Sequence, residues 1–167
     1  TRRFYSVGEH SFRVGRHLWI AYPELSAELR ACLSLLGYLH DGSEAWLMDL
    51  PSPLKRNKVL VWGYLVAEAR LEARVEAQFA PGVRAKLEAA GVDVQAAIRH
   101  ADLVLLATER RDLMHPGGPV WQALPEPLSG SISETPCTGA DFRDNLRTLY
   151  ALIGLPFPGD DVLQTNS

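Results

Sequence analysis

Apolar residues recur every three or four positions along most of this chain, which is the spacing that gathers them on one face of an α-helix. The clearest run contains Leu29, Cys32, Leu33, Leu36 and Leu39. We find no convincing stretch of the alternating apolar and polar residues that is typical of a half-buried strand. We therefore predict an all-α fold, with helices near residues 6–21, 25–46, 58–79, 83–90, 94–114 and 141–153.

Helix-starting and helix-breaking residues divide the chain in the same way. Ser6 and Glu9 have the spacing of a capping box, and Asp93 can cap the helix that follows it. Glycines and prolines are concentrated in residues 115–139, which predicts a long ordered loop or flap there. A chain of 167 residues is long enough for one domain. We predict a single domain over 1–167, with a core of about 1–114, the loop 115–139 and a C-terminal helix of about 141–153.

The charge balance and the composition exclude several classes of protein. The chain has 17 Lys and Arg against 20 Asp and Glu, a net charge of −3, so we expect no nucleic-acid partner. No run approaches the roughly 18 apolar residues of a membrane span, so we expect no membrane partner. Two cysteines are too few to staple a domain of this size, which suits the reducing cytoplasm. Because the chain begins Thr-Arg-Arg, we do not expect position 1 to be the natural start.

Four residues have the chemistry of metal ligands: His10, the adjacent pair His40 and Asp41, and Asp102. Imidazole nitrogens and carboxylate oxygens bind divalent metals such as Zn, Mn, Co or Fe. All four lie in segments predicted to be helical, and helical bundles build metal sites in this way. On spacing alone, a helix cap at His10, a core histidine at His40 and a solvated Asp102 explain the same residues.

The sequence around these four residues extends the pattern. It reads Tyr5-Ser-Val-Gly-Glu-His-Ser, then Leu39-His-Asp-Gly-Ser-Glu, then Asp49-Leu-Pro-Ser-Pro-Leu-Lys55, then Ala101-Asp-Leu-Val-Leu-Leu-Ala-Thr-Glu-Arg-Arg-Asp-Leu-Met114. This order resembles the HD-domain metal-dependent phosphohydrolases, and within them the bacterial 5′-deoxynucleotidase branch and the related phage deoxyadenosine triphosphate triphosphohydrolases. The resemblance covers about residues 2–114. It implies a single HD-domain helical bundle in which His10, His40, Asp41 and Asp102 hold one divalent metal.

The resemblance also implies roles for two further acidic residues. Glu44 follows His40 by four residues and Asp41 by three, so on one continuous helix all three project from one face. A carboxylate there suits proton transfer with the water bound to the metal, and the resemblance makes Glu44 catalytic. Asp49 becomes a substrate or catalytic acid near the sugar hydroxyl. A surface carboxylate at Glu44 and a helix cap at Asp49 are the alternatives.

Basic residues near these motifs are candidates for binding phosphate. Lys55 matches the family pattern, and Arg2 and Arg3 precede His10 closely enough to reach the same substrate. Solvated surface charges are the alternative for all three. Tryptophans such as Trp46, Trp62 and Trp121 are more often core or flap residues than platforms for stacking, and Trp121 is the best of the three for stacking on a nucleobase. For Glu109 and the arginines that follow it, we expect an internal ion pair.

The resemblance thus implies an enzyme, a metal-dependent phosphohydrolase that acts on deoxynucleotides. A 5′-deoxynucleotidase is the first choice. A deoxynucleoside triphosphate triphosphohydrolase, with Mg as a possible metal, and a non-catalytic, metal-stabilised regulatory protein are the alternatives. Glu44 and Asp49 favour the enzyme, because a purely structural site needs neither. We expect a small nucleotide as substrate, a location in the cytoplasm (that of the host for a phage protein), and homo-oligomers that use the apolar residues 59–67.

Overall fold

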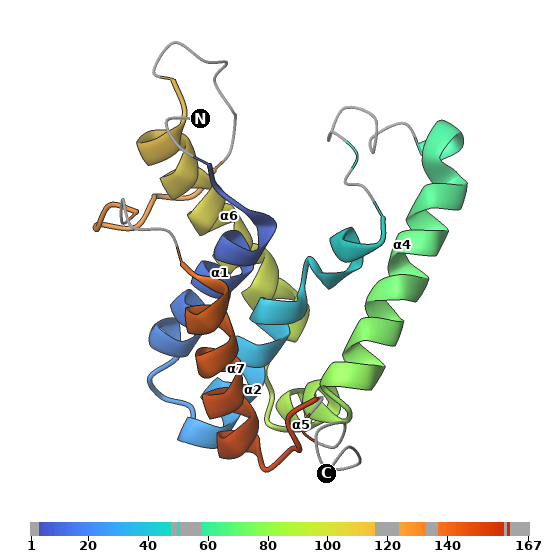
Figure 1. Cartoon of the computed structure of the whole chain (residues 1–167), viewed down its shortest axis with the longest axis vertical. Helices are drawn as coiled ribbons and strands as arrows, with labels where there is room; N and C mark the ends of the chain where they lie inside the picture. The colour runs from blue at the N-terminus through green and yellow to red at the C-terminus, as the bar shows by residue number, and fades with distance from the viewer. Residues whose placement is uncertain are drawn as a thin grey trace.

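The chain folds into a bundle of α-helices, as its periodicity predicts (Figure 1). This computed structural model describes residues 4–47, 50, 58–115, 124–132, 137–158 and 160. The described helices are α1 (Val7–Ala21), α2 (Ala27–Leu39), the 3₁₀ helix η1 (Gly42–Ala45), α4 (Lys58–Phe79), α5 (Val83–Ala89), α6 (Val94–Leu113) and α7 (Gly139–Ile153). None of these described segments forms a β-strand.

Side-chain caps set the starts of four helices. Ser6 accepts a hydrogen bond from the backbone N–H of Glu9, and Asp93 accepts one from Ala96, so both predicted caps are confirmed. Two further caps were not predicted. At the start of α2, Ser26 accepts a hydrogen bond from the backbone N–H of Leu29. Thr138 and Asp141 form a reciprocal capping box, and α7 therefore begins at Gly139, two residues earlier than the predicted start.

Helix α2 is the centre of the bundle. Every residue from 31 to 38 is buried, because α2 packs against α1, α5 and α7. A helix that is buried on all sides needs small or apolar residues around its whole circumference. The sequence provides them, and the buried hydroxyl of Ser34 donates a hydrogen bond to the carbonyl of Gly15 at 2.8 Å.

Two glycines let α1 and α2 cross closely. A Cβ atom on Gly15 would lie 2.0 Å from the ring of Tyr38, and one on Gly37 would lie 2.4 Å from a methyl group of Leu18. The two helices form an antiparallel hairpin joined by residues 22–26. His10 precedes Gly15, and His40 follows Gly37, so both histidines lie on the same side of the crossing. This packing is what brings them together.

The end of α2 corrects one prediction. The predicted helix 25–46 instead begins at Ala27 and ends at Leu39, and η1 follows it. Two features explain the end. The imidazole of His40 hydrogen-bonds to the carbonyl of Gly37, an acceptor that a continuing α-helix needs for its own backbone. Gly42, a poor helix former, comes next and lies against Val75 of α4.

Helix α4 stands to one side of the bundle and mainly contacts η1 (Figure 1). Its Val75 is buried, whereas Trp62 is 67% exposed. No helix in the described part of the chain is both long and apolar enough to cross a membrane. Part of the predicted loop packs on α6, where the backbone of Leu128 donates to the buried Thr108 and Arg111 donates to the carbonyls of Leu128 and Gly130.

Candidate metal centre

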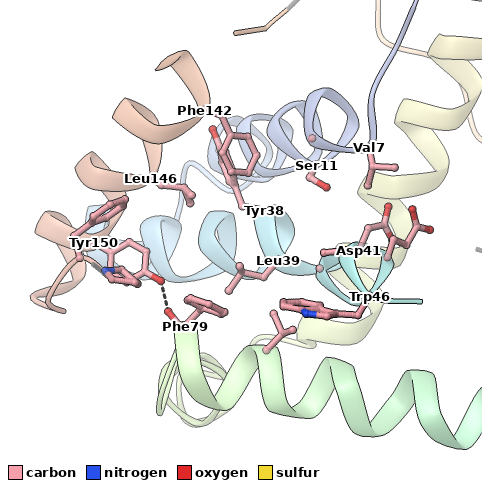
Figure 2. Close-up of a pocket in the computed structure, with 17 residues that line it drawn as sticks. Val7, Ser11, Tyr38, Leu39, Asp41, Trp46, Phe79, Phe142, Leu146 and Tyr150 are labelled. Atoms are coloured by element: carbon pink, nitrogen blue, oxygen red, sulfur yellow. Dashed lines mark hydrogen bonds between the residues drawn. The ribbon is translucent and has the colours of Figure 1, made fainter. Parts of the chain in front are cut away.

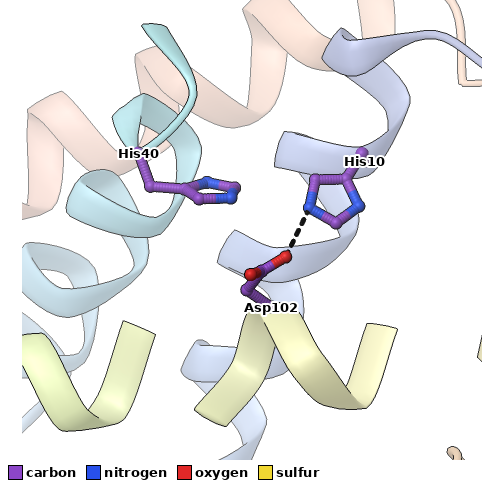
Figure 3. Close-up of side chains that lie close together, drawn as sticks. All are labelled: His10, His40 and Asp102. Carbon is purple, nitrogen blue, oxygen red and sulfur yellow. Dashed lines mark ion pairs between the residues drawn. The ribbon is translucent and has the colours of Figure 1, made fainter. Parts of the chain in front are cut away.

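Three of the four predicted ligands come together where α1, α2 and α6 meet (Figure 3). His10, His40 and Asp102 each offer one ligand atom, and these three atoms lie within 4.8 Å of one another. Nε2 of His10 is 3.2 Å from a carboxylate oxygen of Asp102. The rings of His10 and His40 have centroids 5.3 Å apart. Residues far apart in sequence therefore converge on one point.

The fourth predicted ligand, Asp41, lies at the edge of this group. Its Oδ2 is 3.2 Å from Nε2 of His40 and 3.8 Å from Nε2 of His10. The side chain of Asp41 is 30% exposed, whereas those of His10 and His40 are each 12% exposed. Two largely buried nitrogens thus face carboxylates that solvent can still reach.

The ring of His40 has one nitrogen in use and one without a partner. Nδ1 donates a hydrogen bond to the carbonyl of Gly37 at 2.8 Å, so in the neutral ring it is Nε2 that carries the lone pair. Nε2 is buried and makes no hydrogen bond, although Oδ2 of Asp41 lies 3.2 Å away. A buried polar atom without a partner costs free energy, so this nitrogen calls for a cation or a donor.

The ring of His10 is oriented by a carboxylate on its other side. Nδ1 donates to Oε1 of Glu109 at 2.6 Å, and the same oxygen accepts a hydrogen bond from the hydroxyl of Tyr5 at 2.7 Å. This arrangement points Nε2 toward Asp102. Glu109 and Asp102 are two turns apart on α6 and hold opposite nitrogens of one imidazole.

Glu109 is a residue whose role the sequence interpretation missed. We expected it to form an ion pair with a neighbouring arginine, but the structure turns its buried side chain to His10 and Tyr5. Its spacing of seven from Asp102 was the signal that could have found it, since residues two turns apart share a helix face. Carboxylates that orient metal-binding histidines in this way are common in metal sites.

The electrostatics of the cluster favour positive charge. Burial lowers the pKa of His10, but hydrogen bonds with Asp102 and Glu109 outweigh this effect and raise its pKa to about 10. Burial raises the pKa of Asp102, but the hydrogen bond and the charge of His10 hold that pKa below its ordinary value. With no metal in place, a proton on Nε2 of His10 supplies the positive charge that these carboxylates require.

These residues fit a divalent transition metal. The partnerless Nε2 of His40 offers a lone pair, and Nε2 of His10 becomes a second nitrogen ligand once its proton leaves. Asp102 and Asp41 add carboxylate oxygens. Two imidazoles with carboxylates suit Zn, Mn, Co and Fe, and Mn also accepts sites richer in oxygen.

A cavity with polar walls borders this cluster. It has a volume of about 430 Å³, and its lining includes His40, Asp41, Asp102, Glu76, Arg84 and Arg99. Both guanidinium nitrogens of Arg84 that face Glu76 are taken up by that carboxylate. Arg99 is exposed and forms no ion pair with any described residue. It lies one turn before Asp102, so its cation is available to an anion at the cluster, although the sequence interpretation did not select it.

Glu44 lines a second, apolar cavity that it shares with Asp41. Because α2 ends at Leu39, Glu44 lies on η1, and the predicted face shared by His40, Asp41 and Glu44 on one α-helix is wrong. The role predicted for Glu44 stays a prediction. Four other predicted site residues lie outside the described residues, namely Asp49, Lys55, Arg2 and Arg3, and so does Trp121.

Comparison with known proteins adds one relative. The chain is similar to the uncharacterized protein YfdR of Escherichia coli (strain K12), with 31% identity over 122 residues, which are 72% of this chain and 55% of that protein. The chain thus spans about half the length of the relative that it matches. No family model matches the chain. No solved structure matches it.

Proposed function

We propose that this chain is a metal-dependent phosphohydrolase that acts on deoxynucleotides, in the first place as a 5′-deoxynucleotidase. The observation that carries the proposal is the buried Nε2 of His40, which has no partner and lies within 4.8 Å of the ligand atoms of His10 and Asp102. The choice of deoxynucleotides comes from the resemblance of the motifs around these residues to HD-domain phosphohydrolases.

When bound, the metal supplies Lewis acidity to a water molecule and to a phosphoryl oxygen. The chain's own residues do the rest. His10, His40, Asp41 and Asp102 would hold the ion, and Glu109 keeps Nε2 of His10 directed toward Asp102. Glu44 accepts the proton of the attacking water and returns it to the leaving oxygen. Water adds to phosphorus and the bond from phosphorus to the 5′ oxygen breaks, which yields a deoxynucleoside and phosphate.

The phosphate also needs a cation from the protein. Lys55, Arg2 and Arg3 remain candidates on their sequence positions alone. Arg99 is the described candidate, since it lines the polar cavity together with His40 and Asp102. Guanidinium groups bind phosphate oxygens in pairs, which fixes the orientation of a phosphate as well as its charge.

A nucleotide panel tests the proposal. The purified chain is incubated with deoxynucleoside mono-, di- and triphosphates of each base, in the presence of Mn²⁺, Co²⁺, Mg²⁺ or Zn²⁺. We expect phosphate release from monophosphates that stops with a chelator and returns with added metal. Triphosphate release from a triphosphate would instead assign the triphosphohydrolase reaction. No hydrolysis of any nucleotide with any of the four metals would contradict the proposal.

A further inference from the structure

Apart from Asp41 and Glu44, the residues that line the apolar cavity have no part in the chemistry described so far. Its volume is about 490 Å³, within the range of sites that bind small molecules. Helices η1 and α4 form one wall, and α1, α2 and α7 form the other (Figure 2). Aromatic rings dominate the lining, among them Trp46, Phe79, Phe142 and Tyr150.

The two ends of this cavity differ in chemistry. Asp41 lies at one end, next to the metal centre, whereas Tyr150 and Phe79 lie at the other (Figure 2). Glu44, three residues after Asp41 on η1, also lines the cavity. The hydroxyl of Tyr150 donates a hydrogen bond to the backbone carbonyl of Phe79. It is therefore already satisfied, and the far end offers a ligand mainly the surfaces of rings.

Trp46 lies at the same end of the cavity as Asp41 (Figure 2). It follows η1 directly, lines the cavity, and is nevertheless 63% exposed. A large indole left open to solvent beside a cavity lined by rings is suited to stack on a flat ligand. Leu39 and Asp41 line both this cavity and the polar cavity, so the two cavities are neighbours. A ligand whose anionic end reaches the metal centre can thus place an apolar, planar end against Trp46.

We infer that the apolar cavity receives the nucleobase of the substrate and that Trp46 stacks on it. This inference rests on the proposed function, and it specifies the substrate as a phosphate ester that carries a planar, aromatic group. Since the far wall presents rings, recognition depends on the face of the base. Every base has such a face, so the site tolerates different bases.

A binding experiment tests this inference without requiring turnover. The chain carries Glu44→Gln in every sample to slow hydrolysis, and it is loaded with Mn²⁺. Affinities for 2′-deoxyadenosine 5′-monophosphate and for 2-deoxyribose 5-phosphate are measured by calorimetry. Trp46→Ala removes the proposed stacking surface. Trp62→Ala is the matched control, because this tryptophan is 67% exposed on α4 and does not line the cavity.

We expect the nucleotide to bind about tenfold more tightly than the sugar phosphate, the low part of the range for one stacked base. Trp46→Ala removes most of this difference, and Trp62→Ala preserves it. The monophosphates of the four bases bind within about tenfold of one another. Equal binding of nucleotide and sugar phosphate, or an unchanged difference in Trp46→Ala, would overturn the inference. So would a shift in oligomeric mass on Trp46→Ala with base-dependent binding intact, since that result assigns the cavity to a second copy.

The outcomes separate this inference from the proposed function. Base-dependent binding that requires Trp46, in a chain that hydrolyses no nucleotide, supports the cavity and rejects the phosphohydrolase. Hydrolysis of nucleotide and sugar phosphate with equal KM supports the phosphohydrolase and rejects the cavity.

Discussion

His40 and Glu44 are only four residues apart, but the structure holds them in different ways. His40 ends a helix that is buried on all sides, and its Nδ1 is tied to the carbonyl of Gly37. Glu44 lies on the short 3₁₀ helix η1, whose main neighbour is α4. Trp46, which directly follows η1, is largely exposed. The packing of the bundle thus places the proposed metal ligands, whereas a short 3₁₀ helix places the proposed proton-transfer group.

The largest expected effect is on metal content, which distinguishes a proposed ligand from the proposed proton-transfer group. Asp41→Ala is expected to reduce the metal content from about one ion per chain to a level near zero, because it removes a carboxylate from the cluster. Glu44→Gln changes a residue of η1 that is not a proposed ligand, so this variant is expected to keep the metal. Elemental analysis of both variants after loading with Mn²⁺ checks this difference. Full metal retention in Asp41→Ala would remove it from the ligand set, and loss in Glu44→Gln would add Glu44 to that set.

The second effect concerns turnover. Glu44→Gln is expected to slow hydrolysis of the best deoxynucleotide by about 10²–10⁴-fold, the usual contribution of a general acid or base. The fold and the metal content stay unchanged, which circular dichroism and elemental analysis verify. Wild-type turnover in this variant would show that the proton moves without Glu44.

The third effect is the pH dependence of the affinity for the metal. In the metal-free chain the pKa of His10 is raised to about 10, so below that pH a proton occupies the nitrogen that the metal needs. Metal binding must expel this proton, and affinity for Mn²⁺ is expected to rise by about tenfold per pH unit between about pH 7 and 9. Calorimetry at several pH values measures the slope. A constant affinity over this interval would contradict the protonation of His10.

The raised pKa of His10 also affects the stability of the metal-free chain, which is expected to fall as the pH rises. A folded-state pKa raised from 6.5 to about 10 stabilises the fold fully below about pH 6.5. This contribution is lost as the pH rises through about 10. Urea denaturation of the metal-free chain is therefore expected to show a falling free energy of unfolding between these pH values, while metal-loaded samples gain affinity.

The fourth effect concerns Glu109, which hydrogen-bonds to Nδ1 of His10. Glu109→Gln is expected to weaken metal binding by about 10–100-fold, as is usual when a carboxylate that orients a ligand is lost. The exposed Glu88→Gln is the matched control and keeps wild-type affinity. Equal affinities in the two variants would show that His10 is oriented without Glu109.

The smallest effect compares the packing of the two regions directly. Gly15→Ala is expected to destabilise the fold by about 1–3 kcal/mol, because its Cβ would overlap the ring of Tyr38 in the crossing of α1 and α2. Gly63→Ala on α4 has open space around it and is expected to stabilise the fold by about 0.5–1 kcal/mol. Chemical denaturation measures both. A stable Gly15→Ala variant would contradict the close crossing.

The helices and most of their ends could be predicted because local rules determine them. Apolar spacing identified the buried α2, and Ser6 and Asp93 identified their caps. The end of α2 could not be predicted from spacing, because it depends on a hydrogen bond between the side chain of His40 and a backbone carbonyl. Periodicity continued past this point, and so the predicted helix did too.

In the site too, local patterns predicted some features, whereas others depend on tertiary packing. His10, His40 and Asp102 could be selected by their chemistry and by resemblance, and the crossing at Gly15 and Gly37 explains why they meet. The roles of Glu109 and Arg99 depend on which face of α6 turns to α1 and to the polar cavity. The spacing of seven residues indicates that Glu109 shares a helix face with Asp102, but which element that face meets is a property of tertiary packing.

The most direct test of the account is the position of the metal itself. Crystals of the chain loaded with Mn²⁺ would give an anomalous difference map that locates the ion. The account predicts one peak, bound by Nε2 of His10 and of His40 and by oxygens of Asp41 and Asp102. A peak bound elsewhere, or through Nδ1 of either histidine, would contradict the ligand set and the phosphohydrolase proposal built on it.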